Sequence, residues 1–189
     1  MSTYKLIIII ASTRPKRKGP LIANWVLNIA KEYEEFEVEL VDLKDINLPF
    51  LDEPEHPMLK LYHHDHTKQW SKIIDDADAF VVVTPEYNAG YNAVLKNAID
   101  FLYKEWNYKP IALVSYGGVS AGTRAAQMLK QVFTNLKMMP LAESVNIPFF
   151  SKFIDENETF NGDEILEKSA NTMFKELGKW TKSLKQMRE

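Results

Sequence analysis

Leu6-Ile-Ile-Ile-Ile10 is a run of five aliphatic residues, four of them β-branched. A run without polar alternation is typical of a strand covered on both faces, as in a parallel sheet. A polar, basic loop at 12–19 follows it. Beyond the loop, apolar residues recur every three or four positions, as on one face of a helix. They are Ile22, Trp25, Val26, Ile29 and Tyr33.

The same alternation of strand and helix continues along the chain. Apolar runs predict strands at 38–42, 79–83 and 111–114, and a fifth within 138–147 whose length Pro140 limits. Helical spacing follows the third and fourth strands and recurs near the carboxyl end at about 163–187, where Asp163 is a candidate N-cap. The apolar positions of the two middle helices are Val94, Leu95, Ala98, Ile99 and Leu102, then Ala125, Leu129, Val132, Phe133 and Leu136.

This order predicts an α/β fold with three layers and a parallel sheet. No repeat, low-complexity tract or linker divides the sequence, so we expect one domain over residues 1–189. The longest irregular segment, at about 52–66, contains all four histidines. They lack a helical i, i+4 pair and a supporting carboxylate motif, so we interpret the segment as a polar loop and expect no metal site.

Composition excludes several classes of protein. Apolar residues make up 46% of the chain, which is typical of a globular protein, and the net charge of −3 gives no reason to expect nucleic-acid or membrane partners. The absence of cysteine excludes disulfides, thiolate metal sites and cysteine nucleophiles. Residues 1–5 lead into a short apolar segment without a cleavage pattern, and no apolar run approaches the roughly 20 residues of a membrane span. We expect a soluble, cytoplasmic protein.

Ligands of doubly wound sheets bind at the carboxyl ends of the strands, which directs attention to three loops. The first, Ala11-Ser-Thr-Arg-Pro-Lys-Arg-Lys-Gly-Pro20, opens a helix whose N-terminal N–H groups attract anions. Ser12 and Thr13 add hydroxyls, and Arg14 and Arg17 add forked donors for a phosphate. Neither the Walker loop nor the dinucleotide fingerprint is present, so we predict the phosphate of a mononucleotide cofactor. A solvated basic turn is the alternative.

The second loop, Thr84-Pro-Glu-Tyr-Asn-Ala-Gly90, follows the third strand. Pro85 would fix the turn, Gly90 would permit close approach, and Tyr87 would offer an aromatic wall. Backbone groups of such a turn can pair with the edge of a planar heterocycle. A tight strand–helix connection without a ligand would look similar.

The third loop, Ser115-Tyr-Gly-Gly-Val-Ser-Ala-Gly122, is rich in glycine and opens another helix. Its N–H groups could stabilise negative charge on a ligand or contact the phosphate of a nicotinamide cofactor, and Tyr116 could stack on a ring. Simple turn chemistry is the alternative. Ser115 lacks the Gly-x-Ser-x-Gly elbow of a hydrolase nucleophile.

The longer stretch Thr84-Pro-Glu-Tyr-Asn-Ala-Gly-Tyr-Asn-Ala-Val-Leu-Lys-Asn-Ala-Ile-Asp100 resembles the signature of the NADPH-dependent FMN reductase family. These flavodoxin-like proteins include quinone, azo-dye and chromate reductases. Ser12-Thr-Arg14 and Ser115-Tyr-Gly-Gly118 match the family's other two loops, in order, and the resemblance covers roughly residues 4–148. Two positions depart from the pattern: Ala11 replaces a glycine, and a proline is replaced around Asn92.

The resemblance implies a flavodoxin-like three-layer sandwich whose five-stranded parallel sheet has the order 2-1-3-4-5. It places the FMN phosphate in the first loop, the isoalloxazine along the second, and the third as the opposite wall. The implied cofactor-binding residues are Ser12, Thr13, Arg14, Arg17, Gly19, Pro85, Glu86, Tyr87, Asn88, Gly90, Ser115, Tyr116, Gly117 and Gly118. Members of the family commonly form homodimers or homotetramers.

The implied function is an FMN-dependent NAD(P)H oxidoreductase. Hydride would pass from NADPH, or NADH, through FMN to quinones or similar acceptors such as azo compounds, flavins or metal oxyanions. Because the cofactor carries this chemistry, we assign no catalytic side chain. The alternatives are a flavodoxin-like electron carrier or flavin-binding regulator with little turnover, and a nucleotide-binding module without flavin.

Overall fold

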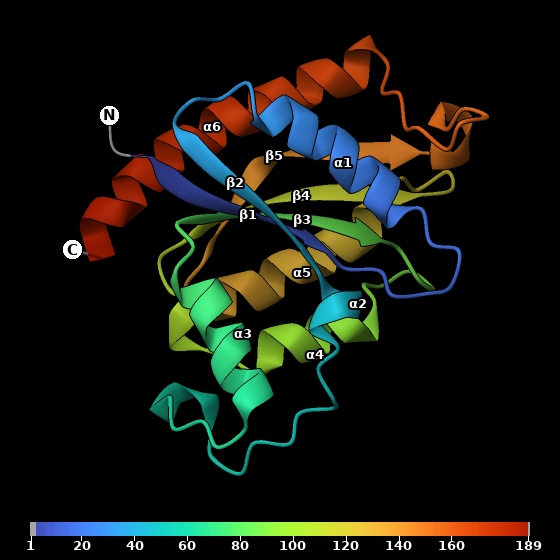
Figure 1. Cartoon of the computed structure of the whole chain (residues 1–189). Helices are drawn as coiled ribbons and strands as arrows, with labels where there is room; N and C mark the ends of the chain where they lie inside the picture. The colour runs from blue at the N-terminus through green and yellow to red at the C-terminus, as the bar shows by residue number, and fades with distance from the viewer. Residues whose placement is uncertain (1–2, 189) are drawn as a thin grey trace.

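A parallel sheet of five strands forms the centre of the protein (Figure 1). The structure is a computed structural model and describes residues 3–188. The strands lie in the order β2-β1-β3-β4-β5, which confirms the predicted fold and strand order. Their bounds are β1 Tyr4–Ile10, β2 Phe36–Asp42, β3 Ala79–Pro85, β4 Pro110–Gly117 and β5 Met139–Pro148.

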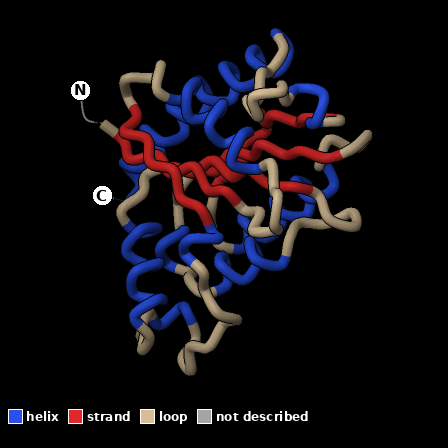
Figure 2. Tube along the Cα trace, turned by 45° about the vertical axis from the view of Figure 1, so that its right-hand side comes forward, coloured by secondary structure: helices blue, strands red, loops and turns tan. Residues whose placement is uncertain are grey.

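Helices cover both faces of the sheet, as the tube drawn from a second direction also shows (Figure 2). One face packs against α1 (Gly19–Ala30) and α6 (Glu164–Arg188). The other face packs against α3 (Asp65–Asp75), α4 (Ala93–Asp100) and α5 (Thr123–Asn135). A short helix, α2 (Leu43–Ile46), follows β2, and three 3₁₀ turns span Pro57–Leu59, Lys104–Trp106 and Phe150–Phe153.

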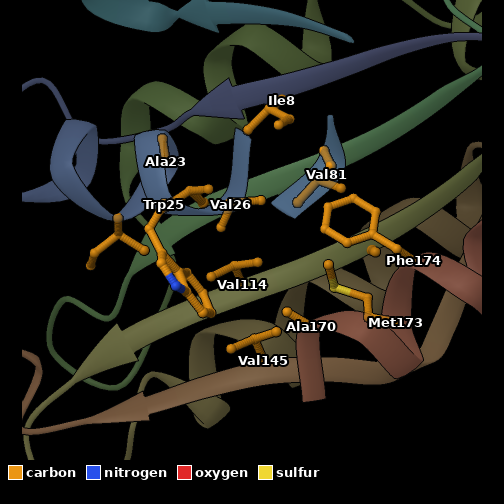
Figure 3. Close-up of a cluster of buried hydrophobic side chains, with 14 of the residues drawn as sticks. Ile8, Ala23, Trp25, Val26, Val81, Val114, Val145, Ala170, Met173 and Phe174 are labelled. Carbon is orange, nitrogen blue, oxygen red and sulfur yellow. The ribbon is translucent and has the colours of Figure 1, made fainter. Parts of the chain in front are cut away.

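The two-sided burial explains why the first strand has no polar alternation. Leu6, Ile8 and Ile10 point into the core shared with α1 and α6, whereas Ile7 and Ile9 point into the opposite core. Figure 3 shows Ile8 in the first of these cores, with side chains of neighbouring strands, α1 and α6 around it. Each such aliphatic side chain contributes roughly 1.5–3 kcal/mol by leaving water.

Helix α3 was not among the predicted helices. Its buried positions are Thr67, Trp70, Ser71 and Ile74, so two of the four are small polar residues. These hide the apolar spacing that reveals the other helices. Trp70 is 1% exposed and its indole N–H donates to the carbonyl of Ala98 at 2.8 Å, which fixes α3 against α4.

The fifth strand is longer than Pro140 led us to expect. It runs over Met139–Pro148 and pairs only with β4, at the edge of the sheet. An edge strand tolerates proline because the missing N–H faces no neighbour. Pro140 lies opposite Ile111, next to a register shift between Ile111 and Leu113.

Helix α6 is fixed at both ends. The carboxylate of Asp163 accepts a hydrogen bond from the backbone N–H of Leu166 at 3.0 Å, which confirms the predicted N-cap. At the other end Lys185 and Arg188 pair with Asp78, at 2.9 and 2.8 Å. Asp78 directly precedes β3, so these pairs tie the end of α6 to the amino edge of the sheet.

No helix in residues 3–188 is long and apolar enough to cross a bilayer. Within the same residues, no group of three histidine, aspartate or glutamate side chains gathers closely enough to hold a metal ion. In the histidine-rich segment, His66 pairs with Asp52 at 3.0 Å and stacks against His64, with ring centroids 5.2 Å apart.

Candidate functional site

A cleft of about 230 Å³ lies between the loops that follow β1, β3 and β4. These strands are neighbours and parallel, so their carboxyl ends meet at one edge of the sheet, at the right of Figure 1. Three cations of the first loop line one side: Arg14, Arg17 and Lys18. Aromatic rings and backbone complete the lining, from Pro85, Glu86, Tyr87, Tyr116, Gly117, Gly118 and Phe150.

Close packing around Gly19 joins the first loop to the strand-four loop. The hydroxyl of Tyr116 donates to Ser12 Oγ at 3.2 Å, and both groups lie against Gly19. A Cβ on Gly19 would lie 2.5 Å from Ser12 Oγ and 2.9 Å from the Tyr116 oxygen, so only glycine fits without a shift. Burial raises the pKa of Tyr116 to about 12, which keeps its hydroxyl protonated at neutral pH. The glycine brings the start of α1 to the cleft.

The first turn of α1 is open to an anion. No side chain caps the helix, Pro20 occupies an early position, and the turn contains no acidic residue. Pro20 has no N–H, and Leu21 and Ile22 donate to the carbonyl of Lys18, so the backbone favours a negative ligand there mainly through the positive end of the helix dipole. Together with the neighbouring cations, the dipole forms a site that fits a phosphate monoester.

The three cations differ in what they already bind. Arg17 makes a two-pronged pair with Asp42, at the end of β2, and also donates to the carbonyl of Ser12 at 2.5 Å. Lys18 pairs with Glu158. Arg14 is exposed and makes no ion pair or side-chain hydrogen bond within residues 3–188. Arg14 and Arg17 were both predicted to grip a phosphate, whereas in the structure Arg17 holds the loop in shape and Arg14 is the arginine whose guanidinium is free to bind a ligand.

The loop after β3 forms a tight two-residue turn. Tyr87 and Gly90 exchange backbone hydrogen bonds of 2.8 and 2.9 Å. Asn88 and Ala89 between them have φ angles of 49° and 65°, as in a type I′ turn. Gly90 was expected to permit close approach, whereas the left-handed positions of the turn are Asn88 and Ala89. A Cβ on Gly90 would only reach ordinary contact with Met128, at 3.6 Å.

Glu86 ties the second loop to the third. Its carboxylate is 6% exposed and accepts hydrogen bonds from Arg124 Nε at 2.7 Å and from the Ser120 hydroxyl at 3.0 Å. The backbone N–H of Arg124, in the first turn of α5, donates to it at 3.1 Å. Burial opposes the charge, but the bonds from Arg124 and Ser120 prevail and hold the pKa of Glu86 below its usual value. The Glu86 carboxylate is therefore occupied, although the residue lines the cleft.

In the third loop, backbone faces the cleft and the serine side chain does not. Ser115 is fully buried, with its hydroxyl 2.8 Å from the carbonyl of Ala121 and 2.9 Å from Asn146 Oδ1. Gly117 and Gly118 line the cleft, and a Cβ on Gly118 would meet nothing within 4 Å. Gly122 has φ +78°, and a Cβ there would lie 2.8 Å from the backbone nitrogen of Tyr116.

The structure separates the predicted residues into two groups. Those that line the cleft are Arg14, Arg17, Pro85, Glu86, Tyr87, Tyr116, Gly117 and Gly118. Those that lie beside or beneath it are Ser12, Thr13, Gly19, Asn88, Gly90 and Ser115. Two lining residues were missed, Lys18 and Phe150. Lys18 belongs to the basic loop and could have been named, but Phe150 follows β5, in a segment without a motif.

Residues 4–152 match the sequence profile of the NADPH-dependent FMN reductase family. The chain belongs to this family. An NAD(P)H-dependent FMN reductase of Schizosaccharomyces pombe is 45% identical over 150 residues, which cover 77% of this chain and 74% of that protein. An NAD(P)H:quinone oxidoreductase of Solanum tuberosum is 30% identical over 158 residues, covering 79% and 77%.

Solved structures agree on the fold. A flavoenzyme from Paracoccus denitrificans, described as an NAD(P)H:(acceptor) oxidoreductase, superposes with a TM-score of 0.72 at 20% sequence identity. The superposition covers 97% of this chain and 98% of that one. The family predicted from the three loops is confirmed, and with it the enzyme class, an FMN-dependent NAD(P)H oxidoreductase.

Proposed function

We propose that the cleft at the strand ends binds FMN and that the protein uses it to reduce quinones or similar small acceptors with NAD(P)H. The observation that carries this proposal is the pairing of two unlike surfaces in one cleft. Cations beside an uncapped helix N-terminus line one side, and aromatic rings with glycine backbone line the rest. A ligand that complements both has a phosphate and a planar ring, as FMN does.

The first loop would hold the phosphate. Arg14 offers charge-assisted bonds from a guanidinium that is not otherwise engaged, and the positive end of the α1 dipole adds a favourable field. Arg17 acts through the backbone, because its bonds to Asp42 and to the Ser12 carbonyl fix the shape of the loop. Ser12 and Gly19 support the loop from beneath, where they meet Tyr116.

The second and third loops would hold the ring. Tyr87 is 37% exposed at the rim, Tyr116 is almost fully buried, and the Phe150 ring lies edge-on to Tyr116 with centroids 5.2 Å apart. The N–H groups of Glu86 and Tyr87 already donate to the carbonyls of Tyr116 and Gly90, at 3.2 and 2.8 Å, so the polar contacts to the ring would come from the backbone at Gly117–Gly118. Of the remaining predicted residues, Glu86, Asn88, Gly90 and Ser115 would support these two loops, and Thr13 would support the first.

FMN, when bound, supplies the redox chemistry by taking a hydride from NAD(P)H and giving up its electrons to an acceptor. The residues of the cleft bind it, orient it and leave one side open to substrates. The relatives' names, an FMN reductase and a quinone oxidoreductase, support turnover with small acceptors and give no support to a slow electron carrier.

Steady-state kinetics test this proposal. A single cleft has to serve the donor and the acceptor in turn, so NADPH oxidation with a benzoquinone should show exchange kinetics. We expect parallel double-reciprocal plots at several quinone concentrations. Intersecting lines without substrate inhibition would show that both substrates bind together, and absence of turnover would contradict the enzyme.

We propose a homodimer or homotetramer, as the family resemblance implies, and sedimentation of the FMN-bound protein would decide between them. A cytoplasmic location stays a prediction.

A further inference from the structure

A small hairpin after β5 approaches the phosphate side of the cleft. Ile154 and Phe160 pair as an antiparallel bridge, and the turn between them is organised by Asp155. The carboxylate of Asp155 accepts backbone hydrogen bonds from Asn157 and Thr159, both at 2.9 Å, and one from the Asn161 amide at 3.0 Å. These bonds give the turn a defined shape although it lies at the surface.

Aromatic packing fixes the hairpin against α1. Phe160 is 4% exposed, and its ring meets Trp25 edge-on at a centroid distance of 5.3 Å. A Cβ on Gly162 would lie 2.7 Å from the Trp25 ring, so the glycine allows this close approach. The hairpin therefore keeps its place beside the start of α1, where Glu158 pairs with Lys18.

The Lys18–Glu158 pair lowers the positive charge that the cleft offers to an anion. Of the cations that line it, Arg17 is neutralised by Asp42 and Lys18 by Glu158. Within residues 3–188, Arg14 is the one lining cation without a carboxylate partner. The two pairs differ in exposure: both side chains of the Arg17–Asp42 pair are 13% exposed, whereas that of Glu158 is 71% exposed. Glu158 is thus the counter-ion that is free to leave.

We infer that Glu158 competes with the phosphate of the cofactor for the Lys18 ammonium, because its carboxylate already pairs with Lys18 on the phosphate side of the cleft. The inference rests on the proposed placement of that phosphate in the first loop. A phosphate dianion that reaches Lys18 has to share it with this carboxylate or displace it, and the two anions repel each other. Lys18 also lowers the pKa of Glu158, so the competitor is ionised at neutral pH. Glu158 therefore limits FMN affinity without affecting ligands that lack a phosphate.

Titration of the flavin-free protein with FMN and with riboflavin tests this role. Glu158→Gln keeps the size of the side chain and removes its charge. We expect FMN to bind the variant roughly 3- to 10-fold more tightly at low ionic strength. The gain should shrink at about 0.5 M salt, because exposed charges are then screened. Riboflavin affinity should not change.

Glu156→Gln is the matched control, since Glu156 lies in the same turn and makes no ion pair within residues 3–188. It should leave both affinities unchanged. An unchanged or weaker FMN affinity in Glu158→Gln would overturn the competitor role, as would equal gains for FMN and riboflavin. Wild-type protein that binds the two flavins equally would instead refute the phosphate site itself, so the two failures are distinguishable.

Discussion

Arg14→Ala is expected to weaken FMN binding about 10- to 150-fold while riboflavin binding hardly changes. A charge-assisted hydrogen bond contributes roughly 1.5–3 kcal/mol, and about 1.4 kcal/mol corresponds to a factor of ten in affinity. Arg14 is the lining cation whose guanidinium is not engaged elsewhere in residues 3–188. Its loss therefore removes a contact to the phosphate and no interaction that holds the loop in shape. Fluorescence titration of the flavin-free variant with each flavin measures both affinities.

Two other variants serve as controls for this result. Lys16→Ala removes a neighbouring exposed cation that does not line the cleft, and should leave FMN binding close to wild type. Tyr87→Ala should weaken FMN and riboflavin alike, because it removes a ring contact and leaves the phosphate contacts intact. If Arg14→Ala weakened both flavins equally, Arg14 would be a structural residue of the loop.

Gly122→Ala is expected to lower the free energy of unfolding by about 2–4 kcal/mol. Gly122 is the N-cap of α5 and has φ +78°, where an alanine is strained whatever the space around it. The added Cβ would also lie 2.8 Å from the Tyr116 nitrogen and 2.9 Å from Ser115 Cβ. Because both neighbours belong to β4, the strand end has to shift. Urea unfolding of the flavin-free protein measures the change.

Gly118→Ala is the control from the same loop. A Cβ there would meet nothing within 4 Å, and its φ is not positive. We expect its free energy of unfolding to lie within about 0.5–1 kcal/mol of the wild type, as for an ordinary surface substitution. Equal losses in the two variants would show that the close packing around Gly122 does not hold the third loop in place.

Much of the sheet could be predicted because its strands are apolar on both faces. The runs at 6–10 and 79–83 are buried throughout, so neither could be mistaken for a surface segment. The strand order did not follow from these runs and came from the family resemblance. Helix α3 was missed for the opposite reason: Thr67 and Ser71 occupy half of its buried positions, and small polar residues give no helical signal.

The candidate site was predicted as three loops but not as a set of contacts. Loop composition cannot tell Arg14 from Arg17, because the partner that distinguishes them, Asp42, ends a strand that only the fold brings near. Phe150 and Glu158 follow β5, where no motif marks them. Phe150 packs edge-on against Tyr116 in the cleft, and the hairpin packed on α1 brings Glu158 to Lys18. Residues that act through tertiary placement are therefore the ones that sequence reasoning left out.

A crystal structure of the FMN complex tests the central claim most directly, since that claim concerns where the phosphate binds. We expect density for the phosphate beside the start of α1, within hydrogen-bonding distance of the Arg14 guanidinium and of backbone N–H groups of the first loop. The ring should lie between Tyr87 and the Gly117–Gly118 backbone. A phosphate that projects into solvent, or a flavin bound away from the three loops, would contradict the account.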